Sequence, residues 1–263
     1  MARLRVAVGG SGNMGRQVMA AVLDAEDMDV VGVLDGLAQS DHVLLSDGSE
    51  VPLANTADAL AGFEADALID FSNAAWTDLL LPHAIEIGVR PIIGTTGLSD
   101  EFVERMVAAS QQAGVGGVIA SNFALGAVMM MHLAAIAAPF FDSVEVIEQH
   151  HDGKVDAPSG TAMTTAQKMR AARDSDFKRN VAERETLPSA RGAELGGVTL
   201  HSVRLPGLVA HQEVYFGGVG ETLKLRHDSI SRESFMPGVL RAVRESAELD
   251  QIVVGLDRLL GLV

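Results

Sequence analysis

The chain has 263 residues, of which 48% are hydrophobic and 21% are charged, enough for one large globular domain or two modest ones. It contains no cysteine, which excludes disulfides, zinc–thiolate sites and thiol nucleophiles. The formal charge of −15 argues against a nucleic-acid partner, and it means that any anionic ligand needs strong local positive charge at its site.

Targeting and membrane segments are not expected. The N-terminus lacks the long apolar core and the cleavage site of a signal peptide, and the absence of cysteine fits a reducing compartment, so we expect a cytoplasmic protein. The most apolar stretch, Phe123 to Phe141, carries His132 and Pro139. It is predicted to be a buried helix, and no membrane contact is expected.

A glycine-rich turn follows the first predicted strand, Leu4 to Val8, and opens into a helical pattern. Its G-x-G-x-x-G spacing is typical of a tight strand-to-helix turn at which backbone N–H groups face a pyrophosphate. Glycine-rich turns are common, so this motif alone is weak. The residues expected to contact a dinucleotide here are Gly9, Gly10, Ser11, Gly12, Asn13, Met14 and Gly15.

An acidic residue follows the second predicted strand, Met28 to Leu34. Asp35 lies 20 residues beyond Gly15, where a ribose-binding carboxylate is expected, although a solvated loop acid is the plainer alternative. Gly36 occupies the position at which an arginine would bind the 2′-phosphate of NADPH, so the absence of arginine there favours NADH. Arg16 could still bind a phosphate. We therefore predict NADH and/or NADPH as cofactor.

Strands and helices continue to alternate, which indicates a parallel sheet with ligand loops at the carboxyl ends of its strands. The expected elements are the strands Ala65–Phe71, Arg90–Ile93 and Val115–Ala120 and the helices Trp76–Ile87 and Ser99–Gln112. Two segments at such strand ends are candidate cofactor contacts, with ordinary turn chemistry as the alternative: Gly94, Thr95 and Thr96, and Ala120, Ser121, Asn122 and Phe123.

The pattern changes after Phe123. We predict a Rossmann-like dinucleotide domain over residues 1–123, joined by the C-terminal segment 234–263. Residues 124–233 form an α+β domain with an open mixed sheet for substrate binding and oligomerisation. The elements expected in this second domain are a helix over Leu125–Ala138, a strand over Ser143–Gln149, a helix from Ser159, and an antiparallel meander of Val198–Leu205, His211–Phe216 and Glu221–His227.

The run from Glu148 to Ala162 concentrates candidate chemistry. It combines His150, His151 and Lys154 with a Pro-Ser-Gly-Thr helix start, a set suited to holding a carboxylate and delivering a proton to it. The plainer alternative is a hydrogen-bonding histidine and a solvated lysine. No metal is predicted, because neighbouring histidines on a strand point to opposite faces and no H-E-x-x-H motif is present.

This run resembles the E-x-H-H-x-x-K-x-D-A-P-S-G-T-A motif of the dihydrodipicolinate reductases at every fixed position, and the resemblance extends over essentially the whole chain. Residues 207–212 depart from the G-x-x-G-E-H form common in that family. The supporting matches are Val8–Arg16, Asp70–Ser72, Gly94–Gly97, Ser121–Phe123, His201–Arg204 and Ser231–Phe235.

The resemblance implies reduction of a cyclic dicarboxylated imine to tetrahydrodipicolinate by a nicotinamide hydride, in diaminopimelate and lysine biosynthesis. His150 matches the proton donor, Lys154 the second catalytic residue and His151 a substrate contact, while Gly160 and Thr161 match the substrate carboxylate cradle. The family is usually tetrameric, so a homotetramer is expected. The rival hypotheses are another two-domain NAD(P)-dependent dehydrogenase and a non-catalytic dinucleotide sensor.

Overall fold

The protein is represented by a computed structural model that describes residues 2–262. The chain divides into two compact units. Unit 1 consists of Met1–Phe123 and Phe235–Val263, and unit 2 consists of Ala124–Ser234. The chain therefore leaves unit 1 once, after Phe123, and returns to it once, at Phe235.

Unit 1 is built on an eight-stranded sheet in the order β13-β7-β6-β5-β1-β2-β4-β3. All of its strand pairs are parallel except β3 with β4. The central strands are almost completely buried, as expected for a parallel sheet covered on both faces. The strands are β1 (Leu4–Gly9), β2 (Met28–Leu34), β3 (His42–Leu44), β4 (Glu50–Ala54), β5 (Ala67–Asp70), β6 (Arg90–Ile93), β7 (Gly117–Ile119) and β13 (Ile252–Val254).

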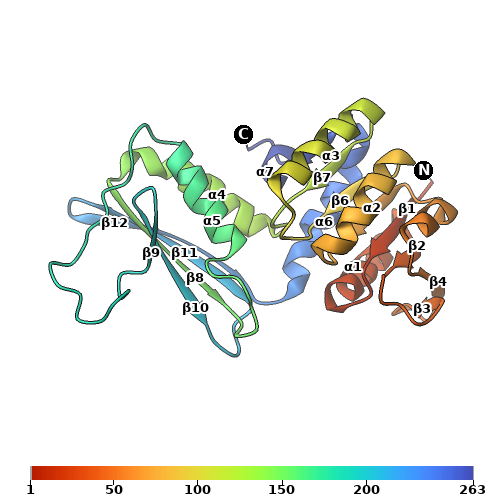
Figure 1. Ribbon diagram of the computed structural model, residues 1–263, viewed down its shortest axis with the longest axis horizontal. Coiled ribbons are helices and arrows are strands. Elements are labelled where there is room, and N and C mark those ends of the chain that lie inside the picture. Colours follow the sequence, from red (N-terminus) through yellow and green to blue (C-terminus); the bar gives the residue numbers. More distant parts are fainter. Residues whose placement is uncertain (1, 263) are drawn as a thin grey trace. The chain divides into compact units, whose positions relative to one another are not determined.

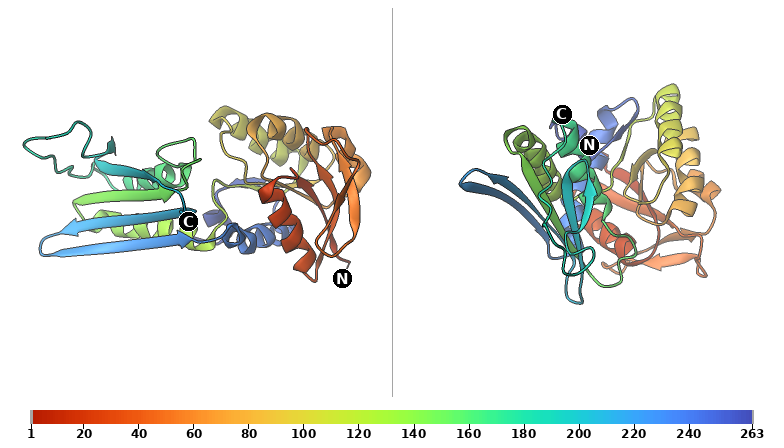
Figure 2. Two further views of the ribbon diagram at one scale, coloured as in Figure 1. Left: turned by 90° about the horizontal axis from the view of Figure 1, so that it is seen from below. Right: turned by 60° about the vertical axis from the view of Figure 1, so that its left-hand side comes forward.

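Helices cover both faces of this sheet (Figures 1 and 2). Helices α2 and α3 contact each other on one face, while α1 and α6 contact each other on the other face. Asn73 and Ser99 begin α2 and α3 as N-caps, each accepting a backbone N–H of the first turn. The helices are α1 (Asn13–Asp24), α2 (Ala74–Glu86), α3 (Asp100–Ala113), α6 (Met236–Glu245) and α7 (Leu256–Leu259), with 3₁₀ turns over Ala57–Phe63 and Ser246–Glu248.

The hairpin of β3 and β4 was not among the predicted elements. Its strands are three and five residues long, and Pro52 interrupts the apolar pattern of β4. Proline cannot donate to a ladder, so it argues against a central strand. The hairpin lies at the edge of the sheet, where a missing donor is tolerated.

Unit 2 contains a five-stranded mixed sheet in the order β12-β11-β8-β10-β9. Helices α4 and α5 contact each other and lie on one face of the sheet (Figure 1). Its elements are α4 (Leu125–Ala137), a 3₁₀ turn over Ala138–Phe140, β8 (Ser143–His150), α5 (Gly160–Ala171), β9 (Ala193–Leu195), β10 (Val198–Arg204), β11 (Ala210–Gly218) and β12 (Glu221–Ser229), and a 3₁₀ turn over Arg232–Phe235 leads back to unit 1.

The predicted antiparallel meander of three strands is wrong in one part. Strands β11 and β12 do form a hairpin, but β10 pairs with β8, in parallel, and β8 separates it from β11. The reason is that β8, α5 and β10 form a β-α-β crossover, and such connections return the chain parallel to the first strand. Because β10 and β11 follow each other in the sequence, they were predicted to be neighbours in the sheet, and the pairing of β10 with β8 was missed.

Helix α4 is buried on one side only, so its prediction as a buried helix needs correction. Residues such as Met130 and Ala134 belong to the core of unit 2, whereas Met129, Leu133 and Ile136 are 40%, 44% and 54% exposed. The even apolar composition of the segment hid this division. None of the helices over residues 2–262 combines the length and apolar character needed to cross a bilayer.

Candidate active site

The strand ends of unit 1 form a single row across the sheet. Leu34 pairs with Gly9, Gly9 with Asp70, Asp70 with Ile93, and Ile93 with Ile119. Because these strands are parallel, the segments that follow them leave the sheet at one edge. The structure therefore brings the predicted cofactor segments together, namely the glycine turn, Asp35, Gly94–Thr96 and Ala120–Phe123.

Each glycine of the G-x-G-x-x-G turn has its own physical reason. Gly10 adopts a φ of +90° and donates its N–H to the Leu34 carbonyl at 2.7 Å. A Cβ on Gly15 would lie 1.9 Å from the Gly10 carbonyl oxygen, so only glycine lets α1 approach the turn. Gly12, at the start of α1, faces open space within 4 Å. This opening at a helix N-terminus suits close approach by a phosphate.

The carboxylate of Asp35 is held beside the glycine turn. Its Oδ2 accepts the N–H and the hydroxyl of Ser11 at 2.9 and 2.5 Å, and its Oδ1 accepts the N–H of Leu37 at 3.0 Å. Partial burial raises the pKa of Asp35, but these hydrogen bonds outweigh it and lower the pKa overall. The group is therefore an anionic acceptor where ribose hydroxyls are expected.

A cavity of about 550 Å³ opens at the glycine turn and Asp35. Its apolar wall includes Phe71, Trp76 and Leu79, which follow β5 or lie on α2. Trp76 lies close to Gly36, where an added Cβ would be 3.0 Å from the indole ring. Trp76 and Leu79 were not among the residues predicted to line a cofactor site. The sequence indicated only that both residues lie on the helix that follows a predicted strand, and this position alone does not predict contact with a ligand.

The two other predicted cofactor segments are fixed by buried groups. A Cβ on Gly94 would lie 1.9 Å from the ring of Phe71, which in turn packs edge-on against Phe123 at 5.4 Å. Phe123 and Ala120 are themselves buried, with 0% and 4% of their surface exposed. Burial raises the pKa of Asp70, although its carboxylate accepts hydrogen bonds from Ser72 and Thr77.

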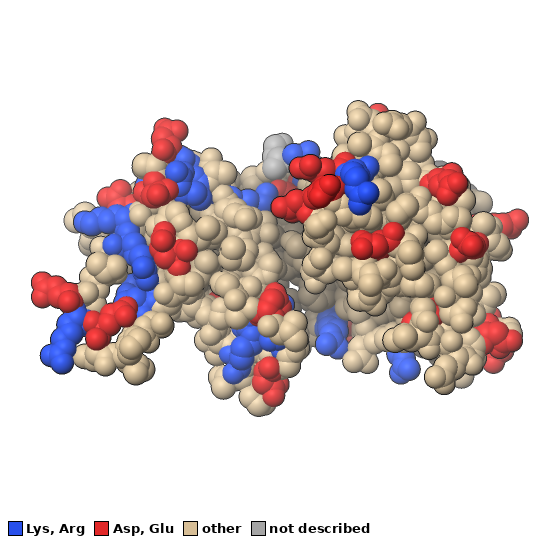
Figure 3. All heavy atoms as spheres, viewed as in Figure 1, with Lys and Arg blue, Asp and Glu red and all other residues tan. Residues whose placement is uncertain are grey.

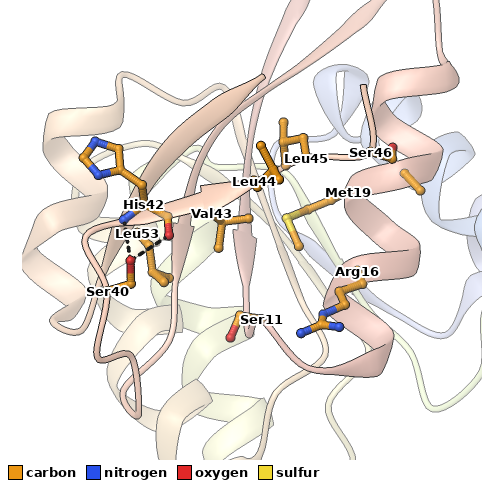
Figure 4. A pocket seen from close by; sticks show the side chains of 11 residues that line it. Ser11, Arg16, Met19, Ser40, His42, Val43, Leu44, Leu45, Ser46 and Leu53 are labelled. Atoms are coloured by element: carbon orange, nitrogen blue, oxygen red, sulfur yellow. Dashed lines mark hydrogen bonds between the residues drawn. The ribbon is translucent and has the colours of Figure 1, made fainter. Parts of the chain in front are cut away.

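A second cavity, of about 620 Å³, lies between α1 and the β3–β4 hairpin (Figure 4). Its wall is mostly apolar, with Met19 and Leu53 among its residues, while Ser11, Ser40 and Arg16 supply polar groups. Ser11 also donates a hydrogen bond to Asp35, so this cavity begins beside the Asp35 carboxylate. Arg16 is exposed and is the one Lys or Arg among its described lining residues.

In unit 2, His150 ends β8 and contacts a buried carboxylate. Its Nδ1 lies 2.5 Å from Oε2 of Glu148, two residues earlier on the same face of the strand. Arg204, which ends β10, is the Cα partner of His150 and donates two hydrogen bonds of 2.8 Å to Glu148. The parallel pairing of β8 with β10 thus assembles a His–Glu–Arg network.

The remainder of the predicted motif surrounds this network. Lys154 forms an ion pair with Asp156 at 2.6 Å, and the backbone carbonyl of Asp156 accepts a hydrogen bond from Arg204. Ser159 caps α5 by accepting the N–H of Ala162 at 3.2 Å. Gly160, the first residue of α5, faces open space within 4 Å, as a site for a carboxylate at a helix start requires.

His150, Lys154, Gly160 and Thr161 were predicted from the sequence as site residues, whereas no role was predicted for Glu148, Asp156, Ser159 or Arg204. The spacing of Glu148 and His150 on a strand was a usable signal for their contact. Arg204 could not be linked to them without the parallel pairing of β10 with β8. His151 follows the end of β8 and lies in the turn rather than on the strand.

Net charge is distributed unevenly between the units. Unit 1 carries 8 Lys and Arg against 21 Asp and Glu, whereas unit 2 carries 12 against 14. In the view of Figure 3, Lys and Arg are accordingly more frequent over unit 2. Any repulsion of an anionic ligand therefore comes mainly from unit 1. Over residues 2–262, no cluster of three or more His, Asp and Glu side chains could hold a metal ion.

Two family models match the chain in succession. The model described as "Dihydrodipicolinate reductase, N-terminus" matches residues 4–123, and the model described as "Dihydrodipicolinate reductase, C-terminus" matches residues 126–260. The boundary between the two models falls where the chain passes from unit 1 to unit 2.

Whole-length relatives agree with these models. A 4-hydroxy-tetrahydrodipicolinate reductase of Bacillus licheniformis is 43% identical over 98% of both chains. A dipicolinate-bound dihydrodipicolinate reductase from Paenisporosarcina sp. TG-14 superposes with a TM-score of 0.84 and 40% identity, covering 97% of this chain and 99% of that one. An amine dehydrogenase from Mycobacterium smegmatis reaches 0.70 at 16% identity, covering 97% and 95%, which shows the shared fold alone.

The Rossmann-like sheet with its glycine turn and the separate mixed-sheet unit define a two-domain protein of the nicotinamide-dependent oxidoreductase class. Within that class, the two matched models and the full-length identity place the chain in the dihydrodipicolinate reductase family. The resemblance found in the sequence is thereby confirmed, as is the predicted fold class.

The glycine turn allows a matched pair of substitutions. We expect Gly12→Ala to weaken NADH binding roughly 10-fold or more with little change in melting temperature, because the new methyl enters the open space at the start of α1. Gly15→Ala should instead lower the unfolding free energy by about 3 kcal/mol, because its Cβ meets the Gly10 carbonyl. Calorimetric titration and thermal unfolding would measure the two effects. Equal behaviour of the variants would contradict this division of roles.

Proposed function

We propose that this chain is a 4-hydroxy-tetrahydrodipicolinate reductase that uses NADH and/or NADPH in diaminopimelate and lysine biosynthesis. The observation that carries the proposal is the His150–Glu148–Arg204 network beside Lys154 and the open start of α5, in a chain of this family. Unit 1 would bind the cofactor, and unit 2 would bind the substrate. The dipicolinate bound to the Paenisporosarcina relative is a cyclic dicarboxylate, the same chemical class as the proposed substrate.

The proposed reaction removes the hydroxyl group of the substrate as water and adds one hydride and one proton to the ring. The nicotinamide cofactor, when bound, supplies the hydride. Negative charge then builds up elsewhere in the conjugated system, and a nearby acid must protonate it. His150 fits this role, because its ring is only 14% exposed and is held at Nδ1 by Glu148, which leaves Nε2 to face a ligand.

The two substrate carboxylates require separate partners. Lys154 would stabilise the developing charge and pair with one carboxylate, exchanging the Asp156 carboxylate for that of the substrate. Gly160 and Thr161 would hold the other carboxylate at the N-terminus of α5, where the positive end of the helix dipole lies. His151, in the turn after β8, would contribute a further substrate contact.

Two substitutions test these roles. We expect His150→Gln to lower kcat by about 10²- to 10⁴-fold, the usual contribution of a positioned general acid, with NADH binding nearly unchanged. Lys154→Ala should lower kcat and raise KM together. Nicotinamide oxidation with freshly generated substrate, measured with NADH and with NADPH, provides the readout.

The matched control is His201→Gln on the neighbouring strand. His201 also contacts a carboxylate, Glu145 at 2.8 Å, but it lies outside the proposed catalytic network. Its kcat should remain near that of the wild type. Absence of turnover by the wild-type protein with either cofactor would overturn the reductase function, and full activity of both catalytic variants would overturn the residue roles.

Cofactor preference depends on the surroundings of Asp35. Its carboxylate and the adjacent Gly36 favour NADH, but Arg16 lines the cavity that begins at Ser11 and could hold a 2′-phosphate (Figure 4). If it does, Arg16→Gln should raise the KM for NADPH roughly 10-fold, through loss of a charge-assisted contact, and leave the KM for NADH unchanged. Equal changes for the two cofactors would exclude a phosphate-specific role for Arg16.

Self-association through the sheet of unit 2 is a further part of the proposal. Helices α4 and α5 cover one face, while the other carries an ion-pair cluster in which Lys224 and Arg226 contact Glu213 at 2.8 and 2.6 Å. Such a face, with its charges already paired, can be buried against another copy. We expect a homotetramer in sedimentation equilibrium; a monomer at micromolar concentration would contradict it.

A cytoplasmic location is proposed with this function. The chain has no cysteine, as suits a reducing compartment. A nicotinamide-dependent biosynthetic reaction also requires access to the cellular pool of the reduced cofactor.

A further inference from the structure

Glu148 is the most completely enclosed charged group of unit 2. Its side chain is 0% exposed, yet four hydrogen bonds reach its two oxygens. Oε2 accepts from Arg204 at 2.8 Å and contacts Nδ1 of His150 at 2.5 Å. Oε1 accepts from Arg204 at 2.8 Å and from the backbone N–H of Ser159 at 3.2 Å. A carboxylate offers about four lone-pair sites, so every site is in use.

The carboxyl group of Glu148 is ionised in this environment. Burial acts to raise its pKa, but its hydrogen bonds, above all those with His150 and Arg204, outweigh burial and lower the pKa to about 2. At neutral pH Glu148 therefore has no proton to donate. Arginine and a backbone N–H are obligate donors as well, so three of the four contacts have a fixed direction.

The fourth contact then determines where the proton of His150 lies. An ionised carboxylate can only accept, so Nδ1 of His150 has to carry a hydrogen whether the ring is neutral or charged. The other ring nitrogen, Nε2, becomes the only one that can gain and lose a proton. The tautomer of a histidine is set in this way by the bond that its other nitrogen makes.

We propose that Glu148 is a positioning residue that locks His150 in the Nδ1–H tautomer, so that Nε2 alone delivers the proton to the substrate. The delivery of the proton to a substrate rests on the proposed function, whereas the tautomer of His150 does not. Arg204 assists by holding Glu148 with both of its Nη atoms, which keeps the carboxylate ionised and fixes its plane. The same carboxylate holds the N–H of Ser159, so one group orients both the proton donor and the start of α5.

A structural role alone would make different predictions from a positioning role. If Glu148 served only to neutralise Arg204 inside unit 2, its removal would lower stability without altering the protonation pattern of His150. If it sets the tautomer, replacing its acceptor oxygen with an amide NH₂ should change that pattern. In Glu148→Gln, the amide oxygen can still accept from Arg204 while the NH₂ group faces Nδ1, which favours the Nε2–H tautomer.

The first experiment uses the wild-type protein without substrate. Proton–nitrogen correlation spectra of ¹⁵N-histidine-labelled protein, at a pH where the ring is neutral, distinguish the two tautomers. His150→Gln assigns the signal by its disappearance. We expect His150 in the Nδ1–H form. The Nε2–H form would overturn the inference, and no variant at position 148 has to fold for this result to be obtained.

The second experiment compares Glu148→Gln with Glu145→Gln. Glu145 lies on the same strand and contacts a histidine and an arginine, His201 and Arg191, so it is a matched control outside the proposed network. We expect Glu148→Gln to shift His150 toward the Nε2–H form and to lower kcat about 100-fold, with KM and NADH affinity little changed. Glu145→Gln, checked for an unchanged association state, should leave the His150 signal and kcat unaltered.

These measurements separate the two hypotheses. If the wild-type protein shows the Nδ1–H tautomer but no reductase activity, the proposed function fails while the positioning of His150 by Glu148 stands. If the protein is an active reductase and Glu148→Gln folds, keeps the wild-type tautomer and turns over at the wild-type rate, the positioning role fails while the function stands.

Discussion

Parallel strand pairing brings the candidate functional residues together within each unit. In unit 1, five parallel strands end in one row, so the glycine turn, Asp35 and the loops after β5, β6 and β7 leave the sheet at one edge. In unit 2, β8 and β10 are parallel, so His150 and Arg204 end side by side. A helix that follows such a strand begins near the same edge, with its unpaired N–H groups available to an anion. Such a helix start faces open space at Gly12 in unit 1 and at Gly160 in unit 2.

A buried charge then fixes the local arrangement of unit 2. Enclosing a carboxylate costs several kcal/mol even after the protein relaxes, so Glu148 is tolerable only with Arg204 in place. Outside this network, the positive and negative charges of unit 2 are nearly balanced, because the acidic excess of the chain lies in unit 1. Under the proposed function, a dicarboxylate would meet a unit whose own charges are largely compensated, with Lys154 and the start of α5 as its local positive partners.

Local signals in the sequence were sufficient for most of the fold. Strand-to-helix alternation predicted the Rossmann-like sheet, and the run from Glu148 to Ala162 predicted the candidate site together with the family. Three features of the fold were not predicted, because they depend on contacts that no local sequence pattern reveals. The β3–β4 hairpin is short and contains Pro52, the exposed stripe of α4 is as apolar as its buried side, and the pairing of β10 with β8 joins distant segments. Arg204 was missed with the last of these.

The same pairing bears on the order in which unit 2 folds. Glu148 and Arg204 are 56 residues apart, with α5 and a long irregular segment between them. Contacts across such separations require the closure of a long loop, and they form more slowly than hairpins and helices. The β11–β12 hairpin can form locally, whereas the end of β8 must wait for β10. Until Arg204 pairs with it, the Glu148 carboxylate has to remain hydrated, so the candidate site of unit 2 is expected to be among the last parts of this unit to reach its native state during folding.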